Sequence, residues 1–398
     1  MLKPSQRGEN MPASPIRKLV PFAEAAEKKG IQVLYLNIGQ PDIETPPSIM
    51  NAVKNAHIPI LAYSHSAGNI SYRKKLVQYY QKLNIELTPE NIIVTSGGSE
   101  AIVFAMMSCM DLGDEIIIPE PFYANYNGFA LMAGVKIVTV TSHIEDGFAL
   151  PPIEAIEQSI TNKTKAILIC NPNNPTGYLY RAEEMKKLEE ICFKHQLFLI
   201  SDEAYREFSY NGKATSALEL EKISQQAIVV DTISKRYSAC GARIGAFITK
   251  NKEVYAAAMK FAQARLSPPG LAQILAEAAV DLPDDYFDAP KAAYLSRRDL
   301  LVKRLNAMPG VFCPNPGGAF YVVAQLPIDD GDRFCQWMLE SFSHQGKTVM
   351  MAPASGFYNT KGLGKNQVRM AYVINNGRIS DAMDCLEAAL KIYPGRID

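Results

Sequence analysis

Short runs of consecutive apolar residues alternate along the chain with stretches in which apolar residues recur every three or four positions. The short runs predict strands at residues 32–37, 91–95, 115–118, 135–140, 165–170, 197–200 and 227–230. A strand that is apolar at every position has both faces covered, which is typical of parallel strands between layers of helices. The pattern therefore predicts an α/β fold with a mostly parallel central sheet.

The stretches between these runs predict helices. Residues 99–108 are apolar almost all round, which indicates a buried helix, and residues 123–133 are also helical in pattern. Residues 182–194 place Met185, Leu188, Ile191 and Cys192 on one side, with charged residues between them. Such a helix covers the sheet with its apolar side.

The pattern of apolar and charged residues changes after about residue 285. A long charged helix at residues 291–306 is followed by a shorter stretch of mixed helix and strand. We expect residues 45–285 to form a large domain around the central sheet. Residues 1–44 and 286–398 would form a smaller α+β domain.

Composition excludes several classes of protein. The chain has 398 residues, with 41 Lys plus Arg and 41 Asp plus Glu, so no basic field indicates nucleic acid. No apolar run reaches the ~20 residues that cross a membrane, and the N-terminus lacks a signal peptide's apolar stretch. The seven cysteines are scattered and the five histidines form no cluster, so we expect neither disulfides nor a metal site. These features predict a soluble, cytoplasmic protein.

The candidate chemistry begins at Lys235, which follows the apolar run at residues 227–230. Burial disfavours an ammonium ion and lowers the pKa of a lysine. A deprotonated lysine can attack a carbonyl and hold it as a Schiff base.

A second feature is the segment Ser96-Gly-Gly-Ser-Glu100 between a strand and a helix. It is either a phosphate cradle at a helix N-terminus or a turn that simply requires glycine. Arg243 and Thr232 would supply a cation and a hydroxyl to a phosphate, although Arg243 also suits a surface ion pair.

Two further segments follow predicted strands. Asn171-Pro-Asn-Asn-Pro-Thr-Gly177 is a tight turn in which Asn174 either shapes the turn or donates to a ligand. Asp202 also follows an apolar run, and it is either the N-cap of a helix or a carboxylate whose burial is costly unless it is paired. Tyr205 lies three residues later, on the same side of any helix or turn that starts there.

Taken together, these motifs resemble the class I/II aminotransferases, the fold-type-I pyridoxal phosphate enzymes. The combination is Asn-Pro-x-Asn-Pro-Thr-Gly, Asp-x-x-Tyr, Ser-Lys and Gly-x-Arg-x-Gly, in the family's order and over nearly the whole chain. The resemblance implies a ping-pong transaminase in which Lys235 forms a Schiff base with pyridoxal 5'-phosphate and moves the substrate's α-proton.

The resemblance also implies roles for the other residues. Asp202 would keep the cofactor's ring nitrogen protonated, Asn174 and Tyr205 would bind its phenolic oxygen, and Tyr123 would stack on the ring. The phosphate would be bound by Ser99, Glu100 (through its backbone N–H), Thr232 and Arg243. Tyr63 would reach the phosphate of a second subunit, which implies a homodimer. Arg369 would grip the substrate's α-carboxylate, and Gly39 matches the segment that closes over the substrate.

The side chain of the substrate is less defined. Aspartate is the leading candidate, with aromatic or other neutral amino acids as alternatives. Arg265 would either read a distal carboxylate or lie exposed at a helix end, whereas Phe22, Tyr126 and Phe357 would line an apolar pocket. A C–S β-lyase shares most of these residues. A transcription regulator would need an appended basic DNA-binding helical domain, and no basic helix precedes the first predicted strand. An inactive paralogue conflicts with the presence of the complete set of site residues.

Overall fold

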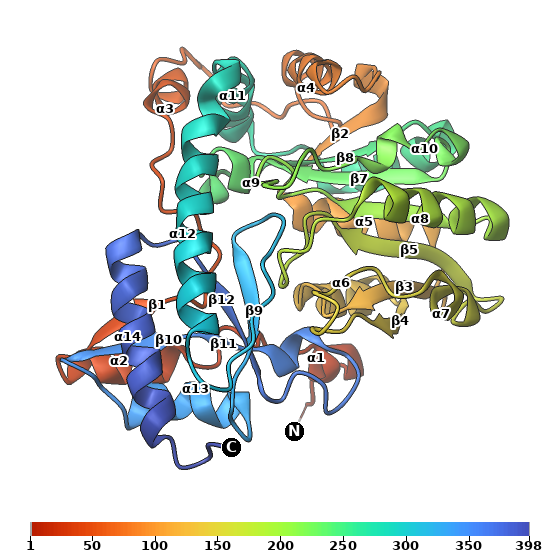
Figure 1. Cartoon of the computed structure of the whole chain (residues 1–398). Coiled ribbons are helices and arrows are strands. Elements are labelled where there is room, and N and C mark those ends of the chain that lie inside the picture. The colour runs from red at the N-terminus through yellow and green to blue at the C-terminus, as the bar shows by residue number, and fades with distance from the viewer. Residues whose placement is uncertain (1, 398) are drawn as a thin grey trace.

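A computed structural model describes residues 2–397 of the chain. At its centre is a seven-stranded sheet with the order β2-β8-β7-β6-β5-β3-β4 (Figure 1). The strands are β2 (Ile92–Thr95), β3 (Glu115–Glu120), β4 (Lys136–Thr141), β5 (Thr164–Cys170), β6 (Phe198–Asp202), β7 (Ala227–Thr232) and β8 (Gly245–Thr249). β8 runs antiparallel to both of its neighbours, and the other neighbouring pairs are parallel. The predicted α/β fold with a mostly parallel sheet is confirmed.

Helices cover both faces of this sheet, which explains why its strands are apolar at successive positions. In β5, Ala166 and Leu168 join a buried cluster with α5 (Gly98–Cys109). Ile167 and Ile169 face the other way and join a second cluster with α8 (Ala182–His195). Successive side chains of a strand point to opposite faces, so two covered faces require a continuous apolar run.

A second region contains two small sheets, at the lower left and centre of Figure 1. One pairs β1 (Gln32–Tyr35) with β10 (Lys347–Met350) in parallel. The other is antiparallel, with β12 (Gln367–Ala371) between β11 (Ala352–Pro353) and β9 (Tyr321–Gln325). The strand predicted at residues 32–37 thus lies outside the central sheet and ends two residues early.

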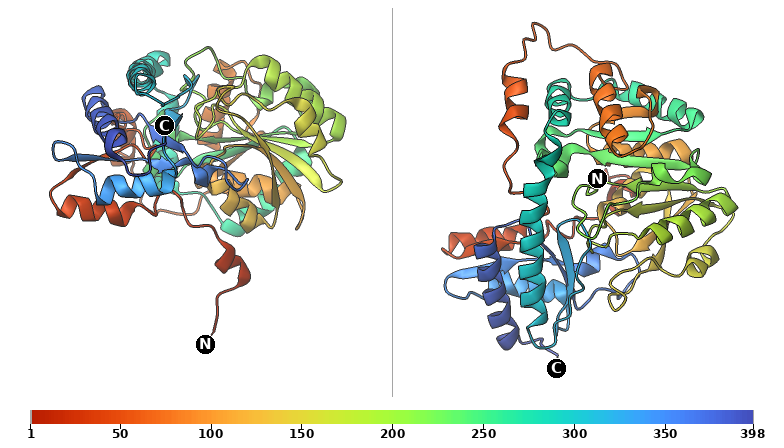
Figure 2. Two further views of the ribbon diagram at one scale, coloured as in Figure 1. Left: turned by 60° about the horizontal axis from the view of Figure 1, so that its bottom comes forward. Right: turned by 45° about the horizontal axis from the view of Figure 1, so that its top comes forward.

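The remaining helices complete the two regions. The long α12 (Asp288–Asn306) runs from the central region down to the small sheets (Figure 1). Figure 2 shows the N-terminal helix α1 standing away from the rest of the chain. The other helices are α1 (Gln6–Asn10), α2 (Val20–Lys28), α3 (Pro47–Lys54), α4 (Ile70–Lys82), α6 (Asn125–Ala133), α7 (Ile153–Gln158), α9 (Ile233–Arg236), α10 (Lys252–Arg265), α11 (Gly270–Val280), α13 (Gly331–Glu340) and α14 (Asn376–Ile392).

The observed ends of two central strands position residues of the candidate site. β6 and β7 extend two residues beyond their predicted ends, so that Asp202 and Thr232 are the last residues of buried strands. Parallel strands therefore deliver these side chains to one edge of the sheet. Between residues 2 and 397, no helix combines the length and the apolar character that crossing a membrane requires.

Candidate active site

The C-terminal ends of β5, β6 and β7 open into a cavity of about 480 Å³. Segments around residues 14–20 and 37–40, together with β9 and β12, close its other side. The cavity brings together ten of the twelve predicted site residues: Gly39, Ser99, Tyr123, Asn174, Asp202, Tyr205, Thr232, Lys235, Arg243 and Arg369. Two others, Glu100 and Tyr63, are not among the residues that line it.

Lys235 lies in the four-residue helix α9, directly after β7. Its Nζ donates to the carbonyl oxygen of Gly39 at 2.8 Å and lies 3.6 Å from the Cys240 sulfur. Burial lowers the pKa of Lys235, and the nearby Arg369 and Arg243 guanidinium groups lower it further against an opposing effect of Cys240. The site therefore shifts Lys235 toward the neutral amine that a nucleophile or a base requires.

Asp202 is the last residue of β6 and is 7% exposed. Its Oδ2 accepts a hydrogen bond from the Tyr126 hydroxyl at 2.9 Å, and its Oδ1 accepts one from the Ala204 N–H at 3.2 Å. Burial raises the pKa of Asp202 to about 6, against the effect of both hydrogen bonds. No ion pair to Asp202 is found among residues 2–397. A cationic group bound in the cavity would favour the ionised carboxylate.

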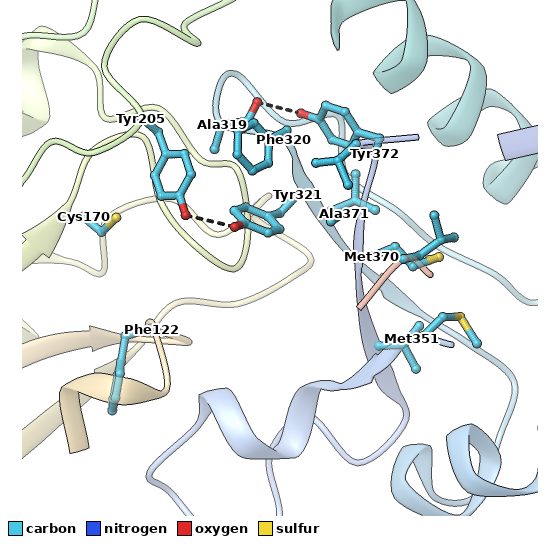
Figure 3. Close-up of a cluster of buried hydrophobic side chains, with 14 of the residues drawn as sticks. Phe122, Cys170, Tyr205, Ala319, Phe320, Tyr321, Met351, Met370, Ala371 and Tyr372 are labelled. Atoms are coloured by element: carbon cyan, nitrogen blue, oxygen red, sulfur yellow. Dashed lines mark hydrogen bonds between the residues drawn. The ribbon is translucent and has the colours of Figure 1, made fainter. Parts of the chain in front are cut away.

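Three polar side chains form a connected row beside Asp202. The amide of Asn174 donates to the Tyr205 hydroxyl at 3.4 Å, and the hydroxyls of Tyr205 and Tyr321 are 2.9 Å apart. Figure 3 shows these two hydroxyls pointing toward one another. The loop that carries Asn174 packs closely against β9, because a Cβ at Gly177 would lie 2.6 Å from the Tyr321 carbonyl oxygen.

The N-terminus of α5 offers an anion site. Gly97 has φ +82°, and a Cβ there would lie 2.3 Å from the Arg243 guanidinium. A Cβ at Gly245 would lie 2.7 Å from the Gly98 backbone nitrogen. The glycines thus let Arg243 and the helix N-terminus come together, where free N–H groups and the helix dipole favour an anion. Thr232 also lines this end, with its hydroxyl donating to the Ile244 carbonyl at 2.8 Å.

Arg369 in β12 is 1% exposed and lies between two aromatic rings, 4.7 Å from the Tyr321 centroid and 4.8 Å from the Phe357 centroid. Its guanidinium donates to the Asn174 side-chain oxygen at 3.2 Å and to the Asn37 carbonyl. Within the described part of the chain, its Nε has no partner. A buried donor without a partner is costly, so this N–H suits a carboxylate bound in the cavity.

Arg265 ends α10 but is not exposed there, so the second predicted alternative is wrong. It is partly buried and donates to the carbonyls of Ser66 and Val94 at 3.2 and 3.1 Å. Its Nε lies 3.6 Å from Glu100, whose carboxylate also accepts from the Ser96 N–H. Arg265 does not line the cavity of its own chain.

The predicted apolar pocket of Phe22, Tyr126 and Phe357 is also wrong, because none of the three lines the cavity. Phe357 is fully buried behind Arg369, and Tyr126 uses its hydroxyl on Asp202. The large aliphatic residues that line the cavity are instead Ile16, Val20, Ile38 and Ile102.

Several lining residues were not predicted. Ser234 and Cys240 are close to Lys235 in sequence, and this proximity was a usable signal. Asn37 is two residues from the predicted Gly39, so it too had a usable signal, whereas Tyr321 and Arg17 lie far from the recognised motifs and reach the cavity only through packing of the second region.

The cavity fits pyridoxal 5'-phosphate by three observations. The lowered pKa of Lys235 suits an amine that reacts with an aldehyde. The buried Asp202 carboxylate, which has no cationic partner among the described residues, suits a protonated ring nitrogen. The glycine-lined N-terminus of α5 suits a phosphate. These three groups line the same cavity.

Comparison with known proteins agrees with this geometry. Residues 31–371 match the family model described as aminotransferase class I and II. An aspartate aminotransferase from Bacillus subtilis is 31% identical over 392 residues, covering 95% of each chain. One from Thermotoga maritima is 30% identical, covering 96% of this chain and 98% of the relative. Among solved structures, an alanine aminotransferase from Pyrococcus furiosus has a TM-score of 0.89 at 31% identity, covering 98% of this chain and 100% of that one.

Proposed function

Because the chain belongs to the aminotransferase class I and II family, we propose that it moves the α-amino group of L-aspartate to a 2-oxo acid such as 2-oxoglutarate. We propose a ping-pong cycle with pyridoxal 5'-phosphate as cofactor. The observation that carries this proposal is the meeting of Lys235, Asp202 and Arg369 in one cavity.

In this proposal the cofactor supplies an aldehyde and a cationic ring that withdraws electrons from the substrate. Ser99, Thr232 and Arg243 bind its phosphate, while Glu100 contributes a backbone N–H. Asp202 binds the ring nitrogen, Asn174 and Tyr205 bind the phenolic oxygen, and Tyr123 covers the ring. Their shared cavity supports these roles, except for Glu100, which lies outside the lining.

Three residues of the chain would bind the substrate, transfer its proton and cover it. Arg369 orients the amino acid by a fork of hydrogen bonds to its α-carboxylate. The neutral amine of Lys235 removes the α-proton and returns it on the cofactor side. Gly39 belongs to the segment that covers the substrate, and its carbonyl holds the Lys235 amine in the present structure.

Aspartate is the leading candidate donor because the relatives from Bacillus subtilis and Thermotoga maritima are named aspartate aminotransferases. The aliphatic lining and the alanine aminotransferase neighbour favour neutral amino acids as the second candidate class.

A donor panel against 2-oxoglutarate tests the proposal. Aspartate, alanine, phenylalanine and tyrosine are supplied in turn, while the spectrum of the bound cofactor and the formation of glutamate are followed. Aspartate should give the highest kcat/KM. A preference for phenylalanine or tyrosine would transfer the assignment to the aromatic class. Pyruvate and ammonia released from cysteine-type substrates without an oxo acid would identify a β-lyase instead.

We also propose a homodimer in which Tyr63 completes the partner's phosphate site. Tyr63 is 80% exposed, and so in large part are Ile60 and Leu61 near it in sequence, Leu271 on the adjoining α11, and Leu266 directly after α10. Leu61 lies against Gly270 at the start of α11. An exposed apolar group of this kind is typical of a protein interface. Residues 45–285 are proposed as the large domain, with residues 1–44 and 286–398 as the small one.

A further inference from the structure

We propose that Arg17 binds the distal carboxylate of the substrate and thereby selects dicarboxylic amino acids and oxo acids. The inference rests on the proposed transaminase function and names the residue that reads the side chain. Arg17 lines the cavity that holds Lys235 and Arg369, although it comes from the N-terminal segment before α2.

The backbone around Arg17 is held on both sides. Leu19 is 2% exposed in the core, and Pro15 packs so closely on Gly356 that a Cβ there would lie 2.3 Å from the proline. Between them, Ile16 packs in a cluster with Phe357, the ring that lies under Arg369. Arg17 therefore follows a residue that packs with Phe357, the same ring that Arg369 contacts, on a segment anchored at Pro15 and Leu19.

The side chain of Arg17 is exposed and is not engaged by another side chain within the described residues. Its guanidinium has no hydrogen bond and no ion pair there, whereas the neighbouring Lys18 pairs with Asp332. Burial raises the pKa of Tyr123, and Arg369, Arg243 and Arg17 each oppose that shift. The field of Arg17 thus reaches the residue proposed to cover the cofactor ring.

The other cations that line the cavity already have roles. Lys235 is proposed to act on the reacting carbon, Arg243 lies at the anion site of α5, and Arg369 is proposed to bind the α-carboxylate. Arg265 is bound to backbone carbonyls outside the cavity. Among the described lining residues, Arg17 is the cation that remains for a second carboxylate, and a guanidinium forms a fork that matches one.

The test compares the wild-type holoenzyme with Arg17→Met, Arg17→Lys and the matched control Lys18→Met. Conversion of the bound cofactor by the donor alone gives kcat/KM for aspartate and for alanine, without interference from a dicarboxylic acceptor. Calorimetry gives the Kd of two unreactive probes, succinate and butyrate.

We expect Arg17→Met to weaken aspartate turnover and succinate binding by about 10- to 100-fold, as for a lost charged hydrogen-bonded pair. Alanine turnover and butyrate binding should change by less than about threefold, since they make no contact with the lost charge. Arg17→Lys should retain part of the selectivity, and Lys18→Met should behave as wild type.

Equal losses for aspartate and alanine, or no loss for either, would overturn the inference while leaving the transaminase intact. A wild-type enzyme that prefers alanine would have the same effect. If the wild type converts no donor, the proposed function fails, and the role of Arg17 fails with it.

Discussion

The side-chain amine of Lys235 donates a hydrogen bond of 2.8 Å to the carbonyl oxygen of Gly39. The two residues are 196 positions apart and come from the central region and from the segment after β1, respectively. The acceptor is a backbone atom, so no side-chain substitution removes it. A change at Gly39 acts by moving the segment, because a Cβ there would lie 1.7 Å from the Tyr321 hydroxyl.

We predict that Gly39→Ala lowers kcat/KM for transamination by about 10- to 100-fold, since small displacements of a positioning group are costly to catalysis. The added methyl must displace either Tyr321, which is hydrogen-bonded to Tyr205, or the 37–40 segment. Steady-state kinetics measure the effect. Gly377→Ala is the matched control, because its Cβ would meet no atom closer than 3.5 Å. Wild-type kinetics in Gly39→Ala would contradict the proposed covering role of this segment.

Lys235→Ala should lower kcat by about 10⁴-fold, because it removes both the nucleophile and the proposed base. The visible absorbance of the lysine-bound cofactor should disappear at the same time. Lys187→Ala, at an exposed position of α8, should change neither property. Retained transamination with a normal spectrum in Lys235→Ala would refute the assignment of the whole site.

Asp202→Asn should change stability in opposite directions without and with cofactor. The pKa of Asp202 is raised from 3.8 to about 6 in the folded protein, so the folded state binds its proton more tightly between these values. Its contribution to stability is therefore present below about pH 4 and is lost as the pH rises through about 6. At pH 8 the cofactor-free Asn variant should be more stable than wild type by about 1–3 kcal/mol.

Thermal or urea unfolding across pH 5–8 measures this difference, which should shrink as the pH falls. With pyridoxal 5'-phosphate bound, the order should reverse, because the proposed ring cation stabilises the carboxylate but not the amide. A pH-independent difference would show that burial of the Asp202 charge is not its cause.

Tyr63→Ala and Lys235→Ala should complement one another if Tyr63 completes the partner's site. Each variant alone should have low activity. After mixing and subunit exchange, activity should approach about a quarter of wild type, because random pairing gives half of the dimers one complete site. Light scattering verifies the dimer. Activity that never exceeds the sum of the separate variants would count against a shared site.

Much of the site was predictable because its residues follow short apolar runs. A continuous apolar strand between two helical layers leaves a strong pattern, and its last residues must lie at the edge of the sheet. Asp202, Thr232 and Lys235 follow this rule. Strand ends were predicted two residues too early at β6 and β7, because a polar residue ends an apolar pattern without ending the strand.

The sequence by itself determined the mostly parallel sheet and the motif residues at its edge, because local patterning and short loops specify both. Only the tertiary structure decided which distant side chains reach the cavity. Arg17 and Tyr321 enter it, whereas Arg265, Phe22 and Phe357 do not. The physical reason is that the packing of the small sheets and the N-terminal segment against the central region is a long-range property. Where Pro15, Leu19 and Gly356 hold that segment determines that Arg17 lines the cavity.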